Sequence, residues 1–207
     1  LCIHDPTMKR TFEPVSVLVM LALTAIAVGA GLWWHQRSAD ADNPYAHLGG
    51  DFTLASASGP VSLSDFQGQV VMLYFGFTSC PDVCPTDLAR MSAVISGLTT
   101  AEAAQVAGVF VTVDPERDTP ERASEYARFF SPYIIGLSGT PQEIEAVARQ
   151  YYVIYNRIKY AGSALGYTID HTATTYLIDA RGVIRDRLQH DASVDEVRRA
   201  VRNLIPG

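Results

Sequence analysis

Two cysteines, Cys80 and Cys84, are the residues whose types and spacing point most directly to chemistry. They follow a continuous apolar run at residues 70–75 and precede a predicted helix that begins at about Pro85, since proline suits the first helical position. Cys84 is then the predicted N-cap, where the positive end of the helix dipole lowers the pKa of a thiol. Two thiols at a helix mouth can form a disulfide or chelate one soft ion. The alternative is a static disulfide or two buried thiols, which would need neither the flanking prolines nor the intervening Asp82.

The spacing of the cysteines bears on which thiol chemistry they perform. Three residues separate Cys80 from Cys84, whereas the thioredoxin-type redox loop has two. The wider loop suits two thiolates that hold a metal ion between them. The spacing alone leaves both a redox pair and a metal site open.

His171 is the candidate third ligand, and it lies just before a predicted strand at residues 174–178. Thiolates select Cu(I), and an added imidazole makes a site that can also hold Cu(II). Zinc is the competing metal, although a structural zinc site usually has four ligands and no fourth is evident nearby. The alternative is a turn histidine bonded to Asp170 or Thr172. Asp170 is also the candidate group for orienting the imidazole.

Strands and helices alternate along the rest of the chain, which predicts an α/β sandwich with a mixed central sheet. Thr119, Thr140 and Ser193 each precede a helical pattern as N-caps. The expected strands are residues 70–75, 109–113, 151–158, 174–178 and 183–188, and the expected helices begin at about residues 85, 120, 141 and 194.

Three motifs in order make the sequence resemble a known family. They are FGFTSCPDVCPT at residues 75–86, TVDPERDTPE at residues 112–121 and YTIDHTATTYLID at residues 167–179. Together they resemble the SCO/SenC family of copper chaperones, over about residues 45–207. The resemblance implies a thioredoxin-like fold behind one membrane anchor.

The same resemblance implies the ligands and the function. Copper, as Cu(I) and Cu(II), is expected to bind Cys80, Cys84 and His171, and the two cysteines are expected to form a redox-active disulfide. The expected function is delivery of copper to the binuclear copper centre of cytochrome c oxidase subunit two. A periplasmic copper donor or thiol reductant is the other expected partner.

An acidic loop at residues 114–120 follows the predicted strand at residues 109–113, at the sheet edge where sites gather. The resemblance implies that this loop borders the copper site and helps a partner dock. The alternative is a plain connection in which Thr119 caps the next helix. Asp82, Asp114 and Asp170 are the acidic candidates for contacts around the ligands or for docking.

Residues 14–34 carry no charge over 21 positions, enough for a helix of roughly 30 Å, the thickness of a bilayer core. This predicts a transmembrane anchor. Lys9 and Arg10 place residues 1–13 in the cytoplasm by the positive-inside rule. The alternative is a signal peptide cleaved near residues 39–41. Met8 opens a natural start, so residues 1–7 are interpreted as an upstream extension.

These features give the expected organisation and location. Residues 35–50 form the predicted linker, and residues 51–207 the copper-binding domain. The domain is expected in the periplasm of a bacterium, on a single-pass inner-membrane anchor, because the n-region lacks the Arg- and Ser-rich composition of a transit peptide.

Composition and rival functions complete the sequence interpretation. The chain of 207 residues has a net charge of −6, which argues against nucleic-acid binding because phosphates require cations. The main alternative function is a thiol–disulfide oxidoreductase that keeps the copper-ligand cysteines of the oxidase reduced. A sensor without delivery is a further alternative. A peroxiredoxin-like peroxidase is disfavoured, since Leu73 and Phe77 occupy the positions of its Pro and Thr/Ser.

Overall fold

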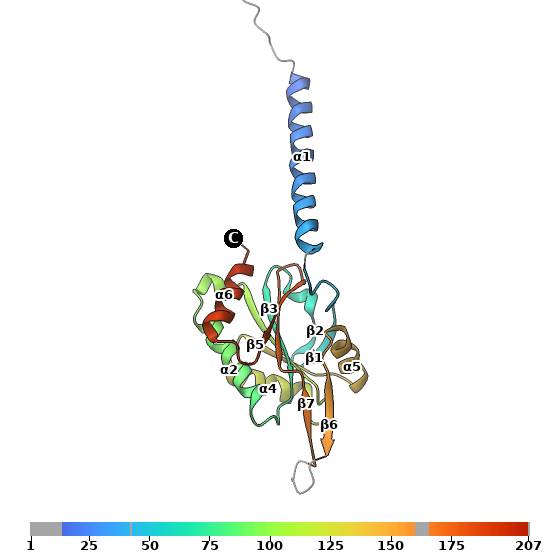
Figure 1. The fold of residues 1–207 in the computed structure, drawn as a ribbon, viewed down its shortest axis with the longest axis vertical. Coiled ribbons are helices and arrows are strands. Elements are labelled where there is room, and N and C mark those ends of the chain that lie inside the picture. Colours follow the sequence, from blue (N-terminus) through green and yellow to red (C-terminus); the bar gives the residue numbers. More distant parts are fainter. Residues whose placement is uncertain (1–13, 42, 160–165, 207) are drawn as a thin grey trace, which may run out of the picture. The chain divides into compact units, whose positions relative to one another are not determined.

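The computed structural model describes residues 14–41, 43–159 and 166–206, and the chain divides into two compact units, Leu1–Asn43 and Pro44–Gly207. The first unit contains the helix α1 (Pro14–Ala41), which includes part of the predicted linker (Figure 1). Among the residues that the structure describes, no helix combines the length and apolar character that crossing a membrane requires. The anchor at residues 14–34 stays a prediction.

A mixed sheet forms the centre of the second unit (Figure 1). It has five strands in the order β5-β4-β3-β8-β9. The central strand β3 (Val70–Gly76) pairs in parallel with β4 (Val106–Thr112) and antiparallel with β8 (Thr174–Ile178). Strand β5 (Ile134–Leu137) continues the sheet in parallel beyond β4, and β9 (Ile184–Gln189) is antiparallel to β8. Every residue of β3, β4 and β8 is buried, as expected for strands covered on both faces. The predicted α/β sandwich with a mixed sheet is confirmed.

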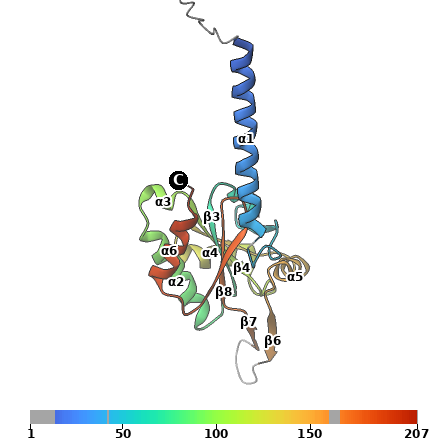
Figure 2. The same ribbon diagram turned by 45° about the horizontal axis from the view of Figure 1, so that its top comes forward.

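Helices cover both faces of the sheet. Helix α2 (Val83–Ser96) contacts α4 (Pro120–Phe130) and α6 (Val194–Leu204). Helix α5 (Pro141–Gln150) lies on the other side of the sheet from α2 and α6 (Figures 1 and 2). Helix α3 (Thr100–Ala103) is a single turn before β4. The side chains that α2 buries recur at helical spacing and are Cys84, Asp87, Leu88, Met91, Val94 and Ile95.

Two small antiparallel sheets accompany the central one. Strands β1 (Thr53–Ser56) and β2 (Gly59–Ser62) form a hairpin, followed by the short helix η1 (Leu63–Phe66). Strands β6 (Tyr155–Lys159) and β7 (Tyr167–His171) form a ribbon that projects from the body of the unit (Figure 1). The sequence analysis did not predict β1, β2, β5, β7 or α3.

The predicted helix caps are confirmed. Thr119, Thr140 and Ser193 each accept a hydrogen bond from the backbone N–H three residues later, at the starts of α4, α5 and α6. These bonds satisfy N–H groups that have no partner inside the helix. The caps therefore fix where three of the helices begin.

The predicted start of α2 is wrong by two residues. The helix begins at Val83, so its N-cap is Asp82 and not Cys84. Pro85 is then the third helical residue, which is still within the first turn, where a missing N–H breaks no intrahelical bond. Cys84 is consequently held by helical backbone geometry and does not sit in the flanking loop.

The predicted strand at residues 151–158 is also wrong in its first half. Tyr151 ends α5, is buried, and donates its hydroxyl to the Gly50 carbonyl at 2.9 Å. Tyr152 has a φ of 53°, which turns the chain away from both helix and strand. The strand β6 therefore begins only at Tyr155, where pairing with β7 starts.

Candidate metal centre

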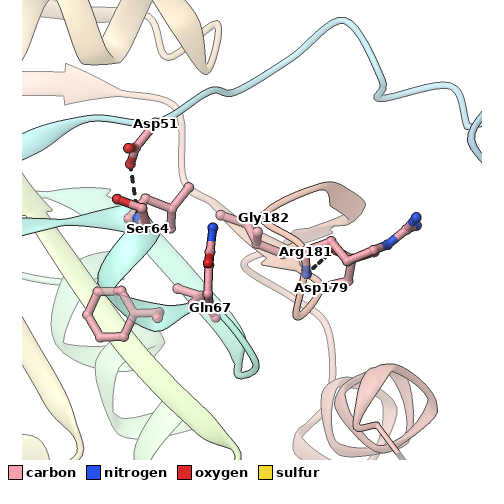
Figure 3. A pocket seen from close by; sticks show the side chains of 10 residues that line it. Asp51, Ser64, Gln67, Asp179, Arg181 and Gly182 are labelled. Atoms are coloured by element: carbon pink, nitrogen blue, oxygen red, sulfur yellow. Dashed lines mark hydrogen bonds and ion pairs between the residues drawn. The ribbon is translucent and has the colours of Figure 1, made fainter.

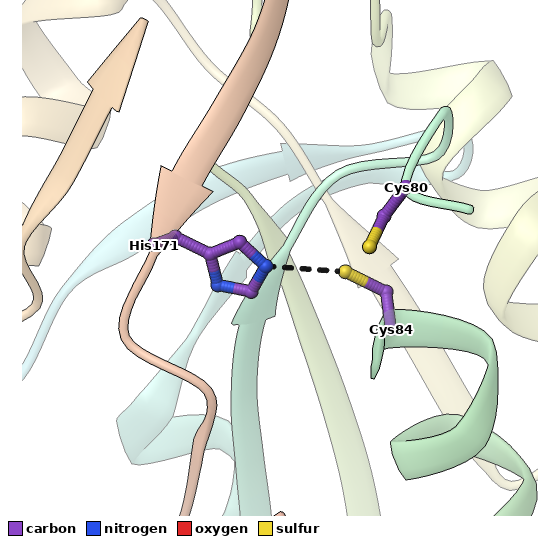
Figure 4. A group of neighbouring side chains, drawn as sticks. All are labelled: Cys80, Cys84 and His171. Atoms are coloured by element: carbon purple, nitrogen blue, oxygen red, sulfur yellow. Dashed lines mark hydrogen bonds between the residues drawn. The ribbon is translucent and has the colours of Figure 1, made fainter. Parts of the chain in front are cut away.

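Cys80, Cys84 and His171 converge at one end of the central sheet (Figure 4). Cys80 lies in the loop after β3, Cys84 in the first turn of α2, and His171 is the last residue of β7. Their ligand atoms all lie within 4.8 Å of one another, and Cys84 Sγ is 3.3 Å from His171 Nε2. The structure thus brings together the three residues that the sequence analysis proposed as ligands.

The three ligands differ in exposure. Cys84 is fully buried, whereas Cys80 and His171 are half-buried. A cavity lined by Ile154, Thr172 and the imidazole opens beside His171. Protein atoms therefore enclose Cys84, whereas solvent reaches the centre from the side of Cys80 and His171.

Gly76, the last residue of β3, makes room for the buried sulfur. A Cβ at this position would lie 2.8 Å from Cys84 Sγ and 2.9 Å from the Tyr74 ring. That separation is shorter than real carbon–sulfur contacts. The strand can pass directly behind Cys84 only because this residue has no side chain.

The imidazole of His171 is oriented by a backbone carbonyl. Its Nδ1 is 3.2 Å from the Thr172 oxygen, and because a carbonyl only accepts, Nδ1 carries the proton in this contact. Nε2 faces Cys84 Sγ at 3.3 Å. The rings of Tyr74 and Phe77 flank the imidazole edge to face, at centroid distances of 6.2 and 5.8 Å.

Asp170 does not take the orienting role suggested for it. Its side chain is exposed, and neighbouring residues of a strand point to opposite faces of the sheet, so Asp170 points away from the face of His171. The Thr172 carbonyl supplies the contact that was expected from a carboxylate. The second acidic candidate, Asp82, is exposed at the N-cap of α2 and makes no side-chain cap bond.

The two thiols differ in acidity, and the lowered pKa that the sequence predicted for Cys84 is found at Cys80 instead. A hydrogen bond from Cys84 lowers the pKa of Cys80 to about 4, with a smaller contribution from His171, against the opposing effect of burial. The same bond and burial raise the pKa of Cys84 well above its usual range. The helix dipole does not decide the result, because Cys84 is fully buried while Cys80 meets solvent. The resting thiolate is on Cys80.

The donor set fits copper. Two sulfur atoms and one imidazole nitrogen are soft and borderline ligands, which suit Cu(I) through the thiolates and Cu(II) with the imidazole. Over the described ranges, no other histidine, cysteine or carboxylate joins this group. Three protein ligands leave a position open, whereas a structural zinc site closes with four.

Two carboxylates of the loop after β4 are buried close to the centre. Asp114, a predicted site residue, does not belong to the ligand group but accepts a hydrogen bond from the Tyr167 hydroxyl at 2.8 Å. Asp118 was missed by the sequence analysis. It is fully buried and accepts hydrogen bonds from Thr78 and Thr112. In the sequence, an acidic residue directly before an N-cap threonine, as Asp118 is before Thr119, is typical of an exposed turn. No residue pattern indicates that Asp118 is buried.

A second pocket, of about 180 Å³, lies between η1 and the turn after β8 (Figure 3). Its two carboxylates already have partners. Asp51 accepts from the Ser64 backbone N–H at 3.0 Å, and Asp179 is paired with Arg185 at 2.7 Å. The pocket contains none of the three candidate ligands.

The chain is similar to proteins of one family. The SCO1/SenC family model matches residues 40–206. An SCO2-like protein of Rickettsia conorii is 40% identical over 157 residues, which cover 75% of this chain and 76% of that protein.

Solved structures agree with this similarity. The copper-bound structure of Arabidopsis thaliana ScoI is 36% identical, with a TM-score of 0.71, over 76% of this chain and 98% of that one. The structure of BsSco, described as having a disulfide switch and as a member of the Sco family of cytochrome c oxidase assembly proteins, shares the fold. It is 24% identical, with a TM-score of 0.61, over 79% of this chain and 96% of that one. With the thioredoxin-like fold and the family match over most of its length, this chain belongs to the SCO1/SenC family.

Proposed function

We propose that this protein binds one copper ion at Cys80, Cys84 and His171 and delivers it to the binuclear copper centre of cytochrome c oxidase subunit two. The observation that carries the proposal is the convergence of two sulfur atoms and one imidazole nitrogen within 4.8 Å. A related ScoI has been solved with copper bound, and the Sco family is described as one of oxidase assembly proteins.

The geometry supports a cargo that enters and leaves from one side. Cys80, a thiolate, and His171 are both half-buried, so these are the ligands that an incoming donor or acceptor protein reaches first. Cys84 is buried and forms the floor of the centre. Copper binding by Cys84 releases its proton, because the thiolate is the ligand. Exchange of copper can then proceed ligand by ligand from Cys80 inward.

We place this activity on the periplasmic side of a bacterial inner membrane. The support is the uncharged stretch at residues 14–34, preceded by Lys9 and Arg10. Fusion of alkaline phosphatase, which is active only outside the cytoplasm, to residue 207 tests this placement. High phosphatase activity that sediments with membranes is expected. Activity released into the soluble fraction would instead support the cleaved signal peptide.

Copper transfer tests the delivery step. The copper-loaded protein is mixed with the apo soluble domain of oxidase subunit two, and the absorption of the binuclear centre is followed. Transfer is expected from the wild type. No transfer is expected from the Cys84→Ser variant that has been treated with copper and mixed with subunit two in the same way. Formation of the centre at equal rates with free copper and with the loaded protein would contradict delivery.

A thiol–disulfide oxidoreductase is the second candidate, favoured by the unequal acidity of the two thiols. In this reaction the Cys80 thiolate attacks a disulfide of the target protein and forms a mixed disulfide. Cys84 then attacks Cys80, and its proton goes to the leaving thiolate of the target. The target gains two electrons and this chain becomes a disulfide.

His171 separates the two candidates. The reductase needs both cysteines, whereas delivery of Cu(II) needs the imidazole as well. A His171→Ala variant that still reduces the target disulfide but delivers no Cu(II) is expected if both reactions occur. A variant that supports oxidase assembly as well as the wild type would favour the reductase alone.

A further inference from the structure

The two halves of the metal centre come from separate sheets. The cysteines follow β3 of the central sheet, whereas His171 ends β7 of the two-stranded ribbon. In the part of the chain that the structure describes, the β6–β7 sheet shares no strand with the five-stranded sheet. The β3–β8 pairing places His171 only through the two residues that join β7 to β8, so contacts on β7 itself also help to set the distance between the imidazole and the sulfur atoms.

Asp118 anchors the half that carries the cysteines. Its carboxylate accepts bonds from the Thr78 backbone N–H at 2.8 Å and from the Thr78 hydroxyl at 2.5 Å. The Thr112 hydroxyl, at the end of β4, donates to the same carboxylate at 2.6 Å. Arg122 Nε lies 3.6 Å from Asp118 Oδ1 and also donates to the Thr78 hydroxyl at 2.8 Å. Since Thr78 is two residues before Cys80, these bonds fix the start of the cysteine loop to β4.

Asp114 anchors the half that carries the histidine. One carboxylate oxygen accepts from the Tyr167 hydroxyl at 2.8 Å, and the other is paired with Arg117. Arg117 in turn donates to the Tyr167 carbonyl at 3.1 Å, and its guanidinium lies 3.8 Å from the centroid of the Tyr167 ring. Tyr167 and His171 are four residues apart on one strand and share a face. Tyr167, the first residue of β7, is thus contacted at its hydroxyl, its carbonyl and its ring.

The two anchors, Asp114 and Asp118, belong to one short turn that is closed by several hydrogen bonds. The Asp118 N–H donates to the Asp114 carbonyl at 2.9 Å, and the Arg117 N–H donates to the same carbonyl at 3.1 Å. Thr112 connects both ends, since its hydroxyl oxygen accepts from the Asp114 N–H at 3.0 Å and donates to Asp118. Movement of one anchor relative to the other would break several of these bonds together.

We propose that the segment Asp114–Asp118 is a brace that sets the separation of the imidazole and the cysteines, with Asp118 and Arg117 as positioning residues. The proposal rests on copper binding at the three ligands and adds the residues that pre-organise them. Groups bonded directly to metal ligands typically change metal affinity by about 10- to 100-fold, and the brace residues, one contact further out, are expected to act near the lower end of that range. Asp118 acts on the cysteines and Asp114 acts on His171. Substitutions in the two halves are therefore expected to change Cu(I) and Cu(II) affinity differently.

The test on the histidine half uses Tyr167→Phe and Arg117→Gln in the full chain. Both are expected to weaken Cu(II) binding by up to about tenfold and to reduce the nitrogen coupling in the Cu(II) EPR spectrum. Cu(I) affinity, measured by competition with a chromogenic chelator, is expected to change little because the thiolates remain. Arg149→Gln is the matched control, since its ion pair with Glu145 is exposed on α5.

The test on the cysteine half uses Asp118→Asn and the milder Thr78→Ala, which leaves the carboxylate bonded to Thr112. Both are expected to weaken Cu(I) and Cu(II) binding together and to shift the sulfur-to-Cu(II) charge-transfer band. If Asp118→Asn does not fold, as judged by circular dichroism, Thr78→Ala carries the test.

A double-mutant cycle separates positioning from general destabilisation. In a His171→Ala background, which keeps only Cu(I) binding, Thr78→Ala is expected to weaken Cu(I) binding as much as in the wild type, because Thr78 acts on the cysteines alone. Tyr167→Phe weakening Cu(I) and Cu(II) binding of the otherwise wild-type chain by equal factors would overturn the brace, since that pattern is general destabilisation and not loss of the imidazole's position. A wild-type chain that binds no copper would instead overturn the proposed function itself, so the two failures are distinguishable.

Discussion

Cys84 Sγ lies 3.3 Å from His171 Nε2, although 87 positions separate the two residues in the sequence. The contact depends on the antiparallel pairing of β3 with β8, which places the strand before the cysteines beside the strand after His171. Both residues are then placed at the same end of the sheet, one in the helix after β3 and one just before β8. The centre is therefore complete only when the long-range sheet has formed.

Gly76→Ala tests the close packing behind the buried sulfur. The added Cβ would lie 2.8 Å from Cys84 Sγ, so the sulfur must move and copper affinity is expected to fall. Overpacking of this kind also lowers the free energy of unfolding by about 1–3 kcal/mol. Copper competition and thermal unfolding measure the two effects.

Gly108→Ala is the matched control for Gly76→Ala. Gly108 lies in β4, where a Cβ would meet Ile134 at 2.8 Å, away from the ligands. This variant is expected to lose stability but to keep its copper affinity after folding. Equal copper affinities for the two variants would contradict the role assigned to Gly76.

The pH dependence of alkylation tests the acidity of Cys80. Because its pKa is lowered to about 4, Cys80 stays a thiolate as the pH falls from 8 to 5, so its reaction rate with iodoacetamide is expected to stay nearly constant. The rate then falls as the pH approaches 4. Cys84, which is buried and protonated, is expected to react slowly throughout.

The alkylation experiment is done in a Cys2→Ser background, so that only two thiols are counted by mass spectrometry. Cys84→Ala provides the control, since it removes the hydrogen-bond donor that contributes most to the low pKa of Cys80. The midpoint of the Cys80 rate profile is expected to move to higher pH in that variant. An unchanged midpoint would show that Cys84 does not stabilise the thiolate.

Oxidation of the cysteine pair is expected to release copper. Formation of a Cys80–Cys84 disulfide removes two electrons and both thiolate ligands, and the imidazole alone holds copper weakly. Treatment with diamide, which takes up the electrons, is expected to free the bound copper, and dithiothreitol is expected to restore binding. Retention of copper by the fully oxidised chain would refute a site built on both sulfur atoms.

Much of the central fold could be predicted because its signals are local. The apolar run at residues 70–75 and the caps at Thr119, Thr140 and Ser193 each mark an element by their own residues. The β6–β7 ribbon escaped prediction in part. Four of the five residues of β6 are exposed and the fifth is half-buried, so it lacks the apolar pattern of a buried strand.

The ligands could be proposed from residue types, but their surroundings could not. The hydrogen bond with Cys80 and, after it, burial raise the pKa of Cys84, and both depend on packing of the whole domain. Asp118 looks in sequence like any acid of a solvated turn, yet it is fully buried with three donors. The carbonyl of Thr172 has no sequence signature at all, since every residue carries one.

An anaerobic copper titration of the reduced chain tests the central claim most directly, comparing the wild type with Cys80→Ser, Cys84→Ser and His171→Ala. Bound copper per chain and sulfur-to-Cu(II) absorption are both read. The expected result is one copper per wild-type chain, loss of binding in both cysteine variants, and loss of the Cu(II) site with retained Cu(I) binding in His171→Ala. Equal loading of Cys80→Ser and wild type, or a Cu(II) spectrum indifferent to His171, would contradict a copper centre built from these three residues.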